Sequence, residues 1–247
     1  MLRSGTGTRN EPGLLRHCAY RIATTTTQAN RIRVRYTTYE FGPHDIHVKT
    51  LRNNLEYDDR DGQAARLGIT SATWSLFGIV WTSGEMLARL MWERNFHGER
   101  ILELGCGIGL ASLALAVRGQ DITATDKHPE AKAFLQYNAK LNHLPPIHYE
   151  RCSWEQTTSS LGKFDLIIGS DLLYDHGSID ALTTFIDQHS RDNCEVFIVD
   201  PNRGLRGKFS NSIAMKGFTA RARTDVNILP GSGVNASVLA YNKNCSP

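Results

Sequence analysis

The chain has 247 residues, the length of one domain or of one domain with an appendage. Apolar residues make up 40% of it, enough for a sizeable core, and no apolar run approaches the length of a membrane span. The net charge of +3 is unevenly spread. Residues 1–36 hold seven arginines and one acid, which leaves 21 basic and 24 acidic residues and a net charge of −3 for the body. This balance argues against a nucleic-acid-binding surface, which needs a basic stripe on the domain itself.

Five cysteines are scattered along the chain, and none forms a C-x-x-C pair. An odd, scattered set indicates a reducing compartment, with neither a zinc site nor a disulfide framework. We therefore expect a cytoplasmic protein without a resident metal. We also expect a monomer that has no membrane or nucleic-acid partner.

Residues 1–30 are rich in Ser, Thr, Gly and Arg and show little apolar periodicity. They are interpreted as a disordered tail or an N-terminal extension. The alternative is an organelle transit peptide, which would make the protein mitochondrial, because such segments are rich in Arg and Ser and poor in acids. The threonine run at residues 24–27 breaks any amphipathic helix and favours the first interpretation.

An alternating pattern begins at residue 31. Ile32, Val34 and Tyr36 are separated by arginines and are predicted to lie on the buried face of a strand. A turn at residues 41–44 and a returning strand at 46–48 complete an expected N-terminal β-hairpin.

A charged, irregular segment follows at residues 51–69 and is interpreted as a loop that acts as a lid over a site. An amphipathic helix is expected next, with Ser83 as its N-cap, because apolar residues recur at helical spacing. The residues on that apolar face are Met86, Leu87, Leu90 and Met91.

A strand, three alternate glycines, a helix and a second strand that ends on an acid follow one another in residues 101–126. The glycines are Gly105, Gly107 and Gly109, and the acid is Asp126. Glycine lacks a Cβ, so the backbone can turn tightly and touch a ligand, and the start of a helix offers free N–H groups. A carboxylate can accept two hydrogen bonds from a ribose diol. This unit predicts the first half of a nucleotide-binding α/β sheet.

The spacing of the glycines is more informative than their presence. The dinucleotide fingerprint is G-x-G-x-x-G, but here the third glycine comes one residue early and Leu110 fills its place. The loop G-x-G-x-G resembles motif I of class I S-adenosylmethionine-dependent methyltransferases, whose cofactor has a ribose and a methionine tail but no pyrophosphate. The resemblance implies that S-adenosylmethionine is the cofactor and is bound by Glu103, Gly105, Cys106, Gly107 and Gly109.

Further strands are expected at residues 147–149, 164–168 and 196–199, with a helix between the last two. Residues 164–168 are nearly all apolar, which is typical of buried parallel strands. Residues 221–228 and 234–241 alternate in polarity and predict a closing hairpin.

The predicted fold class is therefore α/β. We expect a Rossmann-like, seven-stranded, mostly parallel sheet with an antiparallel C-terminal hairpin, plus the N-terminal β-hairpin. One domain is expected over residues 31–247, with the hairpin and lid in 31–75 and the Rossmann-like core in 76–247.

Two further segments carry a more specific resemblance. Trp81-Thr-Ser-Gly84, with Leu87-Ala88 after it, is similar to the Trp-Pro-Ser-Gly segment of the seven-β-strand protein lysine methyltransferases, methyltransferase family 16. Ser170-Asp-Leu-Leu-Tyr174 resembles the Asp-x-x-Tyr motif of that family. The sequence departs from the family pattern at Thr82, which replaces proline, and at Ser153-Trp154, where members often have Asp-Trp.

The resemblance implies roles for particular residues. The remaining cofactor contacts fall on Trp81, which lies beside the cofactor, Asp126 at the ribose, Trp154 near the adenine, and Ser170. Asp171 and Tyr174 are expected to be the catalytic residues at the acceptor entrance, with Asp171 as a proton acceptor or positioning group and Tyr174 orienting an amine. These loops should meet, because ligands of open α/β sheets bind outside the carboxyl ends of the strands.

The function implied is S-adenosylmethionine-dependent transfer of a methyl group to a lysine amine of a protein substrate. A small-molecule acceptor, or a protein arginine or histidine, remains open. An NAD-dependent oxidoreductase is disfavoured because position 110 is not glycine, and a non-enzymatic scaffold because the glycines, Asp126 and Asp171 are intact.

Overall fold

The computed structural model describes residues 32–155, 160–221, 224–227 and 235–243. The chain divides into two units, residues 1–31 and 32–247. The first unit lies outside the described residues, so the expected tail or transit peptide of residues 1–30 stays a prediction. Within the described part of the chain, no helix is both long and apolar enough to cross a membrane.

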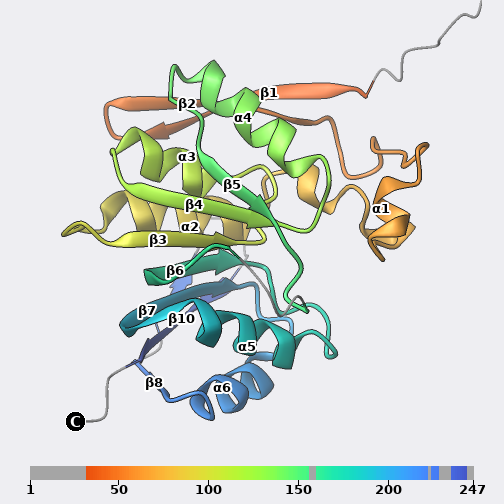
Figure 1. The fold of residues 1–247 in the computed structure, drawn as a ribbon. Coiled ribbons are helices and arrows are strands. Elements are labelled where there is room, and N and C mark those ends of the chain that lie inside the picture. The colour runs from red at the N-terminus through yellow and green to blue at the C-terminus, as the bar shows by residue number, and fades with distance from the viewer. Residues whose placement is uncertain (1–31, 156–159, 222–223, 228–234, 244–247) are drawn as a thin grey trace, which may run out of the picture. The chain divides into compact units, whose positions relative to one another are not determined.

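The predicted N-terminal hairpin is present. Strands β1 (Val34–Phe41) and β2 (His44–Leu51) pair antiparallel (Figure 1). The prediction that Tyr36 faces the core is wrong, because its side chain is 55% exposed. Side chains alternate between the two faces of a strand, and the buried Phe41 places the odd-numbered residues of this part of β1 on the inner face. The Tyr36 hydroxyl instead lies 2.9 Å from that of Tyr137 at the surface.

Helix α4 (Ala131–Leu141) covers the outer edge of β2 through two asparagine side chains. The Asn138 amide accepts a hydrogen bond from the Lys49 N–H at 2.8 Å and donates one to the Lys49 carbonyl at 3.1 Å. Asn142 makes the same pair of bonds with His47, both at 2.7 Å. Each amide thus replaces one residue of a neighbouring strand, which satisfies a sheet edge that would otherwise be open.

The main sheet has the strand order β5-β4-β3-β6-β7-β10-β8, with β9 also paired to β10 (Figure 1). Its parallel strands are β3 (Arg100–Leu104), β4 (Asp121–Asp126), β5 (His148–Arg151), β6 (Phe164–Ser170) and β7 (Ser190–Asp200). The antiparallel part consists of β8 (Phe218–Ala220), β9 (Thr224–Asn227) and β10 (Asn235–Lys243). Because β8 and β9 pair with successive parts of β10, the sheet has seven strand positions in the described residues, which confirms the predicted fold class.

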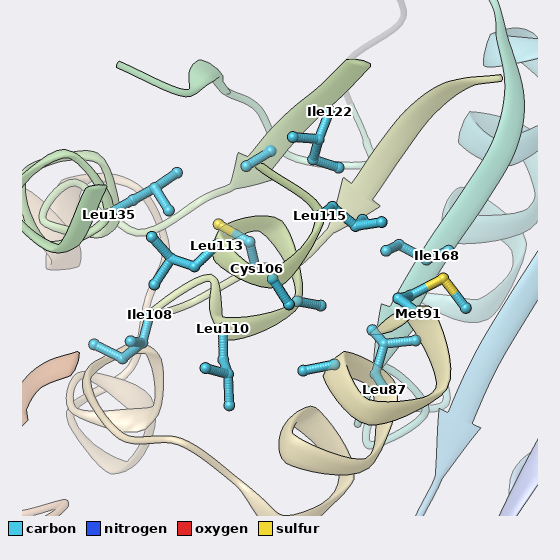
Figure 2. Packing of buried hydrophobic residues seen from close by; sticks show 14 of the residues in the cluster. Leu87, Met91, Cys106, Ile108, Leu110, Leu113, Leu115, Ile122, Leu135 and Ile168 are labelled. Atoms are coloured by element: carbon cyan, nitrogen blue, oxygen red, sulfur yellow. The ribbon is translucent and has the colours of Figure 1, made fainter. Parts of the chain in front are cut away.

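Helices cover both faces of this sheet. One face is covered by α2 (Thr82–Glu93), α3 (Leu110–Val117) and α4, and the other by α5 (Ile179–His189) and α6 (Arg206–Ala214). Alternate strand residues supply the two cores: Ile168 belongs to the first and Ile167 to the second. Figure 2 shows the first core, where Leu87 and Met91 of α2 pack near Ile168.

Two local expectations need correction. The N-cap of α2 is Trp81, and Ser83 is buried inside the first turn, so the predicted N-cap was wrong by two residues. The segment interpreted as a loop and lid contains a short helix, α1 (Gln63–Arg66). The N-cap of α1 is Gly62, and the buried Asp59, three residues earlier, holds the first turn, because its carboxylate accepts the N–H groups of Ala64 and Ala65 at 3.0 and 2.8 Å.

Candidate active site

A cavity of about 500 Å³ opens at the carboxyl ends of the parallel strands. It is lined by the loops that follow β3, β4, β5, β6 and β7, and by the segment that leads into α2. Every site residue expected from the sequence lies in its wall: Trp81, Glu103, Gly105, Cys106, Gly107, Gly109, Asp126, Trp154, Ser170, Asp171 and Tyr174.

The glycine loop has a backbone that other residues cannot adopt without strain. Gly105, Gly107 and Gly109 have φ values of 58°, 53° and 77°. A Cβ on Gly107 would lie 2.9 Å from the carbonyl oxygen of Phe77, and one on Gly105 would lie 2.8 Å from Leu172. The loop therefore needs glycine both for its left-handed conformation and for the close approach of neighbouring segments.

Asp126 ties the end of β4 to the glycine loop. Its Oδ2 accepts the Gly107 N–H at 2.8 Å, and its Oδ1 accepts the His128 N–H at 2.8 Å. Burial raises the pKa of Asp126, although these two backbone bonds oppose the rise. A carboxylate has about four lone-pair sites, so the two bonds leave room for further donors.

Glu103 holds the first turn of α3 through hydrogen bonds to Ser112. Its carboxylate accepts the backbone N–H of Ser112 at 2.9 Å and also the Ser112 hydroxyl. Burial raises the pKa of Glu103 to about 7, and the nearby charge of Asp126 adds to the rise. Cys106, in the same loop, points its thiol into the apolar core (Figure 2), and burial raises the pKa of that thiol.

The segment before α2 lies against the end of β6. A Cβ on Gly84 would be 3.5 Å from the Ser170 hydroxyl oxygen, so the first turn of α2 and the β6 exit loop are neighbours. The Trp81 indole N–H donates to the Leu76 carbonyl at 2.9 Å, which fixes that ring at the cavity wall. Trp154 lies beside the glycine loop, because a Cβ on Gly105 would be 4.0 Å from its ring.

Asp171 forms an ion pair that spans two exit loops. The Arg203 Nε and Nη2 atoms donate to Asp171 Oδ1 and Oδ2 at 2.6 and 2.9 Å. This bond raises the pKa of the Arg203 guanidinium. Tyr174, nearby in the same wall, is 44% exposed, and partial burial raises the pKa of its phenol to about 12, so it stays protonated at neutral pH. From the sequence, Arg203 and Asn202 are candidates to contact an acceptor, but a polar loop tip is the simpler interpretation. The ion pair of Arg203 with Asp171, 32 residues away in the chain, was not predicted.

His128 is a cavity residue that was not predicted from the sequence. Its ring is 3% exposed and stacks on Phe77 with centroids 3.8 Å apart. Nδ1 accepts the Glu130 N–H at 3.2 Å, so the neutral ring is assigned its proton on Nε2, which is buried and lies near the backbone of Trp74. Burial lowers the pKa of His128 to about 4. In the sequence, the only feature that points to His128 as a site residue is its position two residues after Asp126.

The charged groups of the cavity wall are mostly acidic. Its basic side chains are Lys127 and Arg203, and its carboxyl groups belong to Glu103, Asp126, Glu155, Asp171 and Asp175. Such a lining favours a ligand that carries positive charge. In the described part of the chain, no cluster of three or more His, Cys, Asp or Glu side chains is arranged to hold a metal ion.

Comparison with known proteins agrees with this geometry. A family model described as lysine methyltransferase matches residues 65–213, more than half of the chain. The chain belongs to the lysine methyltransferase family. The matched region contains all three segments that meet at the cavity, namely 81–84, 103–110 and 170–174.

Several curated relatives are similar over part of the chain. Protein N-lysine methyltransferase METTL21A of Danio rerio is 26% identical over 168 residues, which cover 63% of this chain and 77% of that protein. The electron transfer flavoprotein beta subunit lysine methyltransferase of Xenopus laevis is 29% identical over 131 residues, covering 51% of this chain and 52% of that protein. The rat protein of the same name is 32% identical over 136 residues, covering 51% of each chain. The chain thus spans about half the length of these two lysine methyltransferases of the electron transfer flavoprotein beta subunit.

Solved structures share the fold at lower identity. The ribosomal protein L11 methylase of Lactobacillus delbrueckii subsp. bulgaricus is 18% identical, with a TM-score of 0.54 over 66% of this chain and 78% of that one. A TehB-like S-adenosylmethionine-dependent methyltransferase of Corynebacterium glutamicum is 16% identical, with a TM-score of 0.53 over 74% of this chain and 97% of that one. Both confirm the Rossmann-like fold.

Proposed function

We propose that this protein transfers a methyl group from S-adenosylmethionine to a lysine side-chain amine of a protein substrate. One observation carries the proposal: the three segments that resemble the protein lysine methyltransferases are far apart in the chain and line one cavity. Membership of the lysine methyltransferase family supports the same reaction.

The residues present suit this cofactor. The glycine loop brings bare backbone to the cavity wall, where a Cβ on Gly107 would collide with the Phe77 carbonyl. Asp126 keeps acceptor capacity for the two hydroxyls of a ribose. We assign the remaining contacts to the two flanking tryptophans, Trp81 and Trp154, and to Ser170. When bound, S-adenosylmethionine supplies a methyl group that is already activated by a positive sulfonium.

The acceptor end of the cavity is assigned to Asp171 and Tyr174. A lysine amine has an ordinary pKa of about 10.4, so presenting it uncharged at pH 7 costs roughly 4–5 kcal/mol. Aromatic surroundings such as the Tyr174 ring reduce that cost, because they solvate an ammonium less well than water does. Because Arg203 forms an ion pair with Asp171 that offsets the charge of its carboxylate, we assign Asp171 a positioning role rather than that of a proton acceptor.

Two measurements test the proposal. S-adenosylhomocysteine, but not NAD, should raise the melting temperature of the purified protein. Protein mixtures incubated with the enzyme and methyl-labelled S-adenosylmethionine should then yield labelled methyl-lysine after acid hydrolysis. Label found in methyl-arginine or methyl-histidine would favour the alternative acceptors, and a lack of any shift with S-adenosylhomocysteine would contradict the proposal as a whole.

We further propose that residues 31–247 form one monomeric methyltransferase domain that works in a reducing compartment such as the cytoplasm. The cysteines in the described part of the chain support a reducing compartment, because Cys106, Cys152 and Cys194 are buried free thiols. A fluorescent fusion of the full chain tests the location. Mitochondrial import that is lost on deletion of residues 1–30 would favour the transit-peptide alternative, and light scattering tests the oligomeric state.

A further inference from the structure

The ion pair between Asp171 and Arg203 joins two loops at the cavity wall. Asp171 lies directly after β6 and Arg203 three residues after β7, and both side chains line the cavity. The Asp171 side chain is only 13% exposed, whereas that of Arg203 is 44% exposed. A planar guanidinium that donates to both carboxylate oxygens fixes the orientation of the carboxylate and also offsets its negative charge.

The backbone on both sides of this pair is held in an uncommon conformation. Among the described residues, the non-glycine residues with positive φ are His143, Asp171 and Asn202. Asp171 is a member of the ion pair, and Asn202 directly precedes its other member, Arg203. The backbone N–H groups of both residues are hydrogen-bonded. The Asp171 N–H donates to the Val199 carbonyl at 2.9 Å, and the Asn202 N–H donates to the Asp200 side-chain Oδ2 at 3.0 Å. Such conformations persist where the surroundings determine them, and they concentrate at functional sites.

The charge of Asp171 matters for the acceptor. A bare carboxylate at the cavity would stabilise a lysine as its ammonium, the form that has no lone pair to accept a methyl group. Arg203 places an opposite charge within hydrogen-bonding distance, so the pair presents little net charge to the cavity.

We propose that Arg203 is a positioning residue that orients Asp171 and cancels its charge at the acceptor end of the cavity. This inference rests on the proposed function, because it assumes that S-adenosylmethionine binds in the same cavity. It assigns a role to a residue outside the three segments on which the family resemblance depends.

The test compares two ligands that differ in charge. S-adenosylmethionine carries a sulfonium, and S-adenosylhomocysteine has a neutral sulfur in its place. The two ligands differ in this charge and in the transferred methyl group. A change in the ratio of their dissociation constants therefore reports a change of electrostatic potential when the variant keeps the space around that methyl group. We would measure both constants by calorimetry for the wild type and for Arg203→Met, which keeps an unbranched apolar side chain and removes the charge.

In Arg203→Met, the bare Asp171 carboxylate should favour the cationic ligand. We expect the preference for S-adenosylmethionine over S-adenosylhomocysteine to rise roughly 3–10-fold, as two charges separated by several ångströms in partly hydrated protein would give. In Asp171→Asn, Arg203 loses its hydrogen-bonded counterion and keeps only the more distant charge of Asp200, so the preference should fall. Asparagine tolerates the left-handed backbone of position 171, so that variant retains the loop. Arg203→Lys should restore a ratio close to that of the wild type.

The chain offers a matched control in Arg191. Its Nη1 atom donates to both oxygens of Asp165 at 2.9 and 2.7 Å, near the start of β6 and outside the cavity wall, and its side chain is similarly exposed at 51%. Arg191→Met should leave the ratio unchanged. An unchanged ratio in Arg203→Met, or an equal loss of affinity for both ligands, would overturn the inference. A wild-type protein that binds neither ligand would instead contradict the proposed function.

Discussion

Asp126 is the residue whose contacts most directly connect the fold to the proposed cofactor. Its two bonds to backbone N–H groups hold the glycine loop and the turn after β4 in place. Hydrogen bonds to charged groups contribute about 1.5–3 kcal/mol each. We therefore expect Asp126→Ala to weaken the binding of S-adenosylhomocysteine about tenfold or more, as measured by calorimetry.

The control for this variant is Asp121→Ala, at the other end of the same strand. Asp121 is 68% exposed, and its nearest basic partner, Arg100, is 4.0 Å away. Its removal should change neither binding nor stability appreciably. If Asp126→Ala bound S-adenosylhomocysteine as tightly as Asp121→Ala does, the assignment of Asp126 to the cofactor would be wrong.

Gly107 illustrates a second requirement at the residue scale, the close approach of two backbones. Gly107→Ala and Gly119→Ala both place a Cβ at positive φ, which costs roughly 1–2 kcal/mol. Only at Gly107 would the new Cβ also meet a backbone oxygen at 2.9 Å, because nothing lies within 4 Å of the Cβ position at Gly119. Urea unfolding should show a clearly larger loss for Gly107→Ala. Equal losses would mean that the Phe77 segment moves aside without cost.

At the scale of elements, the parts predicted correctly are those that local patterns determine. The glycine spacing, the apolar strand at 164–168 and the alternation at 46–48 each follow from the chemistry of neighbouring residues. Helix α6 was not predicted, because its sequence RGKFSNSIA has only Phe209, Ser212 and Ile213 buried and shows no clear apolar face. The pairing of Asp171 with Arg203 and the stacking of His128 were also missed, since both depend on residues far apart in the chain.

The docking of the hairpin onto α4 is another tertiary feature, and it gives an element-scale prediction. Asn138 is fully buried and uses both its oxygen and its nitrogen on Lys49. Asn138→Asp keeps the acceptor but turns the donor into a second acceptor that faces the Lys49 carbonyl. We expect it to cost about 3 kcal/mol or more in urea unfolding, because the second oxygen of a buried carboxylate then faces a carbonyl and has no donor.

The comparison for this variant is Lys140→Ala on the exposed side of the same helix, which should cost less than about 0.5 kcal/mol. A loss in Asn138→Asp no larger than that of Lys140→Ala would show that the asparagine amides do not hold the hairpin.

At the scale of the whole molecule, two buried groups at the cavity give opposite pH dependences. Burial raises the pKa of Glu103 from 4.5 to about 7, so the stability that it contributes is present below pH 4.5 and is lost as the pH rises to about 7. Burial lowers the pKa of His128 from 6.5 to about 4, so its contribution is present above pH 6.5 and is lost as the pH falls to about 4. Each shift corresponds to about 3 kcal/mol. Between pH 4.5 and 6.5 the two slopes oppose each other and nearly cancel.

Single variants should separate these two contributions. His128→Phe keeps an aromatic ring against Phe77 but does not titrate, so only the Glu103 contribution remains. As the pH rises from 4.5 to 6.5, this variant should therefore lose about 2–3 kcal/mol of unfolding free energy relative to the wild type. Glu103→Gln keeps an oxygen for the Ser112 N–H, and only the His128 contribution remains. As the pH rises over the same range, this variant should gain a similar unfolding free energy relative to the wild type. Urea unfolding at pH 4.5, 5.5 and 6.5 measures both slopes, and the double variant should again follow the wild type. Variant and wild-type curves that stay parallel across this range would show that neither group changes its protonation on unfolding. Opposite slopes would show that the cavity wall keeps Glu103 protonated and His128 neutral in mildly acidic solution.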